Sequence, residues 1–100
     1  MSIEYKAKIY YGYELKENWN ENISDEAFEE YVDYFRCTDG CGNKDYSLFA
    51  VDVDYAEEGD YTELSLTVYE DEIHKLAEFA KKHSEILESS PKYFLACEVS

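Results

Sequence analysis

Residues 3–15 read IEYKAKIYYGYEL, and the alternation in this stretch decides the fold class. Apolar and aromatic side chains occupy every second position: Ile3, Tyr5, Ala7, Ile9, Tyr11, Tyr13 and Leu15. Successive residues of a strand point to opposite faces, so a period of two indicates a strand with one face on a core. The sequence therefore predicts a long first strand.

A helix is expected after this strand, beginning at Ser24. Serine is a favoured N-cap, and Asp25 and Glu26 suit the positive end of the helix dipole. The apolar residues that follow recur with helical spacing: Phe28, Tyr31, Val32 and Phe35. Four acids lie off that stripe and would form an acidic outer face: Glu26, Glu29, Glu30 and Asp33.

The remaining elements follow from the same two periodicities. Alternation predicts strands over 46–55 and 62–68, joined by a hairpin. In the first of these, one row holds Phe49, Val51, Val53 and Tyr55, and the other holds Leu48, Ala50, Asp52 and Asp54. Leu48 and Ala50 are expected with Tyr10 on the sheet face away from the helices. A helical stripe begins near Asp71 and ends before Pro91, and a last strand covers 93–99. The predicted buried stripe of this helix is Ile73, Leu76, Ala77, Ala80 and Leu87, widened by Phe79 and Ile86.

This β-α-β-β-α-β order is typical of a ferredoxin-like α+β plait, with two helices on one face of a four-stranded antiparallel sheet. In that plait the first and third strands are central, and the strand over 46–55 lies at an edge. The acidic residues would then form one contiguous flank, along the outer face of the first helix, this edge strand and the hairpin after it.

Composition indicates one folded domain over residues 1–100. Hydrophobic residues make up 45% of the chain and aromatic residues 17%, which separates it from disordered acidic tails. There is no apolar run of the length that spans a membrane and no signal-peptide core. With no export signal, the three cysteines are expected as reduced thiols in a cytoplasmic setting.

The negative charge is concentrated in the middle of the chain. The net charge is −15, and residues 17–74 hold 18 of the 24 acids against only Arg36 and Lys44. Residues 1–16 carry a balance of +1, and residues 75–100 are neutral. A field of this asymmetry steers the approach of basic partners, although acids also serve solubility alone.

A catalytic centre is not expected, and neither is a cofactor. His74 and His83 lie nine residues apart on the second predicted helix, so they would not converge, and both are predicted at the surface. The sequence has no phosphate-binding glycine loop and no nucleophile elbow. We therefore expect a protein that is not an enzyme.

The loop after the first helix holds weak candidates for a metal site. Cys37 and Cys41 could bind zinc together with Cys97, His74 or His83, although structural zinc sites more often show two clear ligand pairs. A calcium site is a second weak candidate, because this segment has side-chain oxygens near glycines at Asp39, Asn43 and Asp45. The residue order of the EF-hand calcium loop is absent. The composition of this segment favours a turn first.

The acidic middle of the chain supplies the predicted partner-binding residues. Asp52 and Asp54 are expected on one side of a strand, about 6.6 Å apart at the usual rise per residue. Carboxylates at such spacings can present something like a row of phosphates to a basic groove, with tyrosines as anchors. The predicted set is Glu26, Glu29, Glu30, Asp33, Tyr34, Asp45, Tyr46, Asp52, Asp54, Glu57, Glu58, Asp60 and Glu63.

This acidic stretch from Glu17 to Glu72 resembles the DNA-mimic anti-restriction and anti-CRISPR proteins of phages in composition, without a shared motif. The resemblance implies an inhibitor that occupies the nucleic-acid site of a basic protein, such as a nuclease or CRISPR effector, and does not bind nucleic acid itself. It also implies the host cytoplasm as the location of a phage-encoded chain. Two alternatives stay open. One is an interaction or regulatory module that uses the open sheet face or an edge strand, and the other is a small metal-binding or ligand-binding domain.

Overall fold

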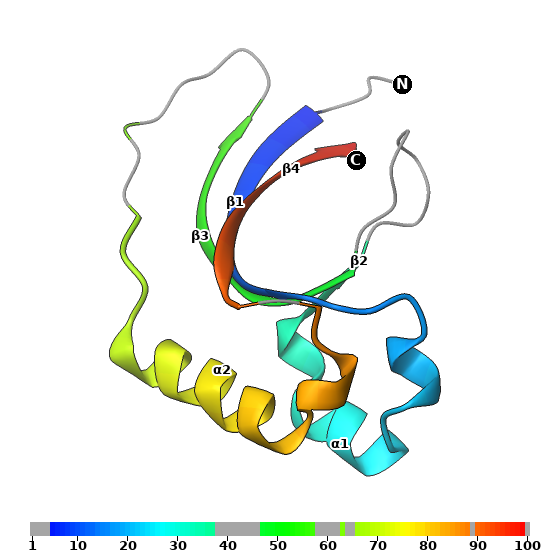
Figure 1. Cartoon of the computed structure of the whole chain (residues 1–100). Helices are drawn as coiled ribbons and strands as arrows, with labels where there is room; N and C mark the ends of the chain where they lie inside the picture. The colour runs from blue at the N-terminus through cyan, green and yellow to red at the C-terminus, as the bar shows by residue number, and fades with distance from the viewer. Residues whose placement is uncertain (1–4, 38–46, 58–62, 64–65, 89, 100) are drawn as a thin grey trace.

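The computed structural model describes residues 5–37, 47–57, 63, 66–88 and 90–99 (Figure 1). The elements in chain order are β1 (Tyr5–Glu14), the 3₁₀ helix η1 (Trp19–Glu21), α1 (Asp25–Glu30), the 3₁₀ helix η2 (Val32–Tyr34), β2 (Phe35–Cys37), β3 (Ser47–Glu57), α2 (Glu70–Lys82), the 3₁₀ helix η3 (Ser84–Ile86) and β4 (Lys92–Val99).

The strands form one antiparallel sheet in the order β2-β3-β1-β4. Both helices lie on the same side of this sheet, outside its curve, as Figure 1 shows. The α+β class, the four-stranded antiparallel sheet and its two helices are therefore confirmed.

Two of the predicted strands are wrong in position. The segment predicted to end the first helix forms β2, and the strand predicted over 46–55 is β3, which lies in the middle of the sheet and not at its edge. Glu63 and residues 66–68, the described part of the predicted strand over 62–68, are not in a strand. The described sheet has four strands because β2, which the sequence does not predict, pairs with β3 at the edge.

The first helix is shorter than predicted. Ser24 is its N-cap, as expected, and the Ser24 hydroxyl accepts a hydrogen bond from the Ala27 amide at 3.2 Å. The helix ends at Glu30, and the chain then passes through η2 into β2, where Phe35 pairs with Phe49. Packing of these rings in the sheet overrides the helical spacing, and Val32 is left exposed.

An aromatic core joins the helices to the sheet. The rings of Phe49 on β3 and Phe79 on α2 stack with centroids 3.7 Å apart. Tyr31 meets both rings edge-on, at 5.8 and 5.1 Å. The other buried members of this cluster are Leu15, Val51, Leu76 and Ile86. These residues come from the rows that the sequence predicts as buried. Two other residues of the predicted α2 stripe, Ile73 and Ala77, are exposed.

The opposite face of the sheet has a smaller core of its own. Tyr10, Leu48, Ala50 and Ala96 are buried there, with Phe94 packed against them. The sequence predicts Tyr10, Leu48 and Ala50 on this uncovered face, and the curvature of the sheet lets these side chains bury one another. The Arg36 guanidinium lies 5.9 Å from the centroid of the Tyr10 ring, in cation–π range.

β1 approaches β3 closely at Gly12. A Cβ atom at this position would lie 2.6 Å from the Ala50 Cα and closer still to the Phe49 carbonyl oxygen. Both of these are backbone atoms, so neither can rotate away. Glycine is therefore required at position 12, because there is no room for a Cβ atom.

We expect Gly12→Ala to lower the free energy of unfolding by about 1–3 kcal/mol, as overpacking does in a filled core. Urea unfolding followed by circular dichroism measures this loss. Lys81→Ala is the control because Lys81 is exposed on α2, outside the sheet, so its effect should stay within about 0.5 kcal/mol. A Gly12→Ala protein as stable as its parent would contradict the close approach.

Candidate protein-binding surface

The segment from η1 to η2 carries a continuous run of exposed carboxylates. Seven acids lie between residues 17 and 33 without an intervening Lys or Arg, and all seven are exposed. We call them the acidic α1 surface: Glu17, Glu21, Asp25, Glu26, Glu29, Glu30 and Asp33. This surface holds nearly half of the protein's net charge.

Aromatic side chains on the inner face of the same segment hold it in place. Trp19 and Phe28 each stack on Phe35, with centroids 4.9 and 5.0 Å apart. The Phe35 ring continues this contact into the main core, with its centroid 5.2 Å from that of Phe49 and 5.8 Å from that of Phe79. Aromatic residues therefore take the inner side and acids the outer side. Trp19 was missed by the sequence reasoning, and its only signal was a lone large aromatic in a polar stretch.

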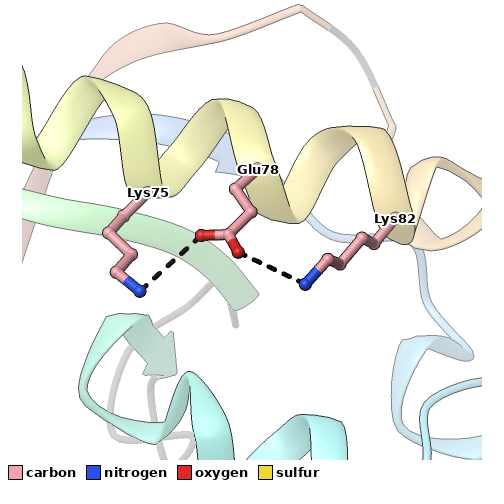
Figure 2. Close-up of polar contacts among 3 residues, drawn as sticks. All are labelled: Lys75, Glu78 and Lys82. Carbon is pink, nitrogen blue, oxygen red and sulfur yellow. Dashed lines mark hydrogen bonds and ion pairs between the residues drawn. The ribbon is translucent and has the colours of Figure 1, made fainter.

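Lys75 and Lys82 of α2 form ion pairs within that helix and not with the acidic α1 surface. The Lys75 Nζ lies 5.9 Å from the centroid of the Tyr31 ring, but it also forms an ion pair with Glu78 at 3.6 Å. Lys82 pairs with the same carboxylate at 3.2 Å, as Figure 2 shows. The described part of the chain gives no ion pair to Glu26, Glu29, Glu30 or Asp33. Their charges are thus directed to solvent.

The electrostatics of α2 reflect this arrangement. The hydrogen bond from Lys82, together with the charge of Lys75, lowers the pKa of Glu78. In turn, the hydrogen bond to Glu78 and the contact with Tyr31 raise the pKa of Lys82. One carboxylate is therefore shared by two ammonium groups.

The acids of β3 are arranged differently from the prediction. In the pairing with β1, Tyr10 lies opposite Asp52 and Ile9 lies opposite Asp54, with Val53 as an extra, bulged residue. Since Tyr10 and Ile9 point to opposite faces, the two aspartates do so too. The prediction that they lie on one side of the strand is wrong.

Two of the β3 carboxylates also have basic partners. The Arg36 Nε lies 3.2 Å from an Asp52 carboxylate oxygen, and the Lys6 Nζ lies 3.9 Å from a Glu57 oxygen. These pairs lower the local negative charge. They make β3 a weaker candidate for a basic partner than the acidic α1 surface.

The described acids therefore do not form the one contiguous flank that the sequence predicts. Figure 1 shows α1 and the first turn of α2, which carries Glu70, Asp71 and Glu72, at opposite ends of the helical layer. Central β3 is buried from Leu48 to Val51 and does not bridge them.

The other predicted binding residues have mixed outcomes. Tyr34 is half-buried, with its ring 5.5 Å from Phe49, and is part of the core. Glu63 is exposed. Asp45, Tyr46, Glu58 and Asp60 lie outside the described residues.

A metal site is not visible in the part of the chain that the structure describes. No three His, Cys, Asp or Glu side chains come together there. Cys41 and the side chains of Cys37 and Cys97 lie outside the described residues, as do Asp39, Asn43 and Asp45. His74 is exposed beside Glu70, at 3.6 Å, whereas His83 is half-buried against Phe79, so its predicted surface position is wrong in part.

Comparisons with known protein families, with curated proteins and with solved structures give no match to this chain. Among the described residues, no helix has the length and apolar character needed to cross a membrane.

We expect Lys82→Met to raise the pKa of Glu78 towards its ordinary value, because the variant removes the hydrogen bond that contributes most to the shift. Carboxyl-carbon NMR across an acid titration measures this pKa. Lys81→Met is the matched control, since the Glu78 ion pairs are with Lys75 and Lys82. An unchanged Glu78 pKa in the Lys82 variant would contradict the shared carboxylate.

Proposed function

We propose that this chain is an acidic protein-binding inhibitor that occupies the nucleic-acid-binding surface of a basic protein, in the manner of the phage DNA mimics. The target class is a nuclease or a CRISPR effector. Within this hypothesis we assign the contact to the acidic α1 surface, with no catalysis and no direct contact with nucleic acid.

The observation that carries the proposal is the run of seven exposed carboxylates from Glu17 to Asp33. Neighbours on a helix surface lie about 5–6 Å apart, so a basic groove can engage several of them at once. Each Lys or Arg of the groove gains a charge-assisted hydrogen bond, and opposite potentials speed association.

The packing beneath the surface supports the same proposal. Trp19, Phe28 and Phe35 fix the inner side of the segment, so little conformational freedom is left to lose when a partner binds. A preordered row of charges is what distinguishes a folded mimic from an acidic tail, which must order itself on binding.

We propose further that the architecture is the ferredoxin-like plait. The strand order, with β1 and β3 in the centre and β2 and β4 at the edges, supports this. Right-handed crossovers through the two helices would place both helices on one face. That arrangement leaves the acidic α1 surface at the outside of the helical layer.

We expect the protein to displace labelled DNA from at least one member of a panel of purified restriction nucleases and CRISPR effectors. Fluorescence anisotropy measures the competition, which should weaken steeply as salt is added. Removing four charges should weaken it by between about 4-fold and about 900-fold, since exposed charge pairs are worth roughly 0.2–1 kcal/mol each. The variant combines Glu26→Gln, Glu29→Gln, Glu30→Gln and Asp33→Asn.

The control removes the same number of charges from exposed positions outside the acidic α1 surface: Glu70→Gln, Asp71→Asn, Glu85→Gln and Glu88→Gln. It should compete almost as well as the parent. Equal losses in the two variants would mean that only net charge matters and would overturn the assignment to α1. A parent protein that displaces DNA from none of the panel members would contradict the inhibitor hypothesis.

A further inference from the structure

The edge of the sheet at β4 carries an exposed apolar surface that the proposed function does not use. The Leu95 side chain is 76% exposed, and Tyr93, two residues earlier on the same face of the strand, is 48% exposed. The Tyr93 hydroxyl donates a hydrogen bond to the carbonyl oxygen of Leu66. Leu66 is a further exposed apolar residue, 49% exposed. We call these three residues the β4 edge patch.

The backbone at this edge is suited to pairing with another strand. β4 is eight residues long and contains no proline, whereas β2, at the other edge, has three residues. Only one side of β4 is paired within the described chain, with β1. An edge of this length with exposed apolar side chains is a template for strand addition.

We propose that β4 pairs antiparallel with β4 of a second copy of this chain, about a twofold axis at Leu95. The two sheets then become one continuous sheet. In this register Leu95 lies beside its own copy, and Phe94 lies opposite Ala96. The exposed Leu95 and Tyr93 side chains of both copies would gather on one face around the axis.

Charge complementarity favours a second copy as the occupant. The same register places Lys92 of one copy opposite Glu98 of the other, and the twofold axis produces this pair twice. A directly opposed pair of opposite charges stabilises neighbouring strands. The strand is therefore complementary to itself in charge as well as in its apolar centre.

The distribution of charge along the chain supports the same choice. Residues 75–100, which include β4, carry four lysines and four glutamates. Two copies can therefore approach at this edge without bringing their acid-rich segments together, in spite of a net charge of −15 each. A strongly basic partner would have no reason to prefer this neutral region over the acidic α1 surface.

Pairing through β4 leaves the proposed inhibitory surface free. β2, which follows directly after the acidic segment, lies at the opposite edge of the sheet from β4. The assembly would display two acidic α1 surfaces, and two linked sites can bind a dimeric target more tightly than one. The pairing itself does not depend on what α1 binds.

Sedimentation equilibrium of the whole protein over a concentration series tests the pairing at physiological ionic strength. We expect a monomer–dimer equilibrium in the parent and a monomer for Leu95→Asp, which places two carboxylates at the axis. Because Leu95 is exposed, this variant should keep the parent's circular dichroism spectrum. A parent that stays monomeric at every concentration overturns the proposal and leaves the patch for a different partner.

A charge exchange tests the register and the identity of the occupant. Lys92→Glu alone should weaken dimerisation about tenfold, because two attractive pairs become repulsive, and Glu98→Lys alone should do the same. The double variant should restore the parent's affinity, which only a second copy with the same exchange can do. Lys81→Glu on α2 makes the same change in net charge and should have little effect. Single variants that dimerise like the parent, or a folded double variant that does not recover, overturn the register.

Discussion

The stack of Phe79 on Phe49 is the contact on which the rest of the structure depends. It joins α2 to the central strand of the sheet, and Tyr31 packs edge-on against both rings. Aromatic pairs of this kind add roughly 0.5–1.5 kcal/mol each beyond the area that they bury. Tyr31 in turn follows α1 directly, so the position of the acidic α1 surface is set by rings beneath it and not by its own hydrogen bonds.

The parts of the fold that the sequence predicts well are long and strongly periodic. Residues 3–15 alternate over a whole strand, and the start of α2 and the Ser24 cap have clear local signals. β2 could not be predicted because it has three residues, and its Phe35 also continues a helical spacing. Residues 62–68 alternate as strands do, but alternation does not say whether a neighbouring strand is available to pair with them.

The candidate site was predicted in part, for a related reason. The sequence correctly predicts Glu26, Glu29, Glu30 and Asp33 as exposed. The reason is that an amphipathic segment exposes its polar residues whichever element its apolar side packs against. Asp52 and Asp54 were misplaced because one extra residue in a strand reverses every face that follows it, and a bulge has no reliable signal in a single sequence. The prediction of one contiguous acidic flank is wrong because β3, which was expected at the edge, lies in the middle of the sheet.

Hydrogen exchange at α1 tests most directly whether packing holds the acidic surface in place. A six-residue helix is unstable alone, so protection of the Phe28 amide, which is bonded to the Ser24 carbonyl oxygen at 2.9 Å, must come from the aromatic core. We expect this amide to exchange slowly in the parent protein and rapidly in Tyr31→Ala, while amides of β1 and β3 stay protected. An α1 amide that exchanges at the rate of an unfolded chain in the parent protein would contradict a preordered acidic surface.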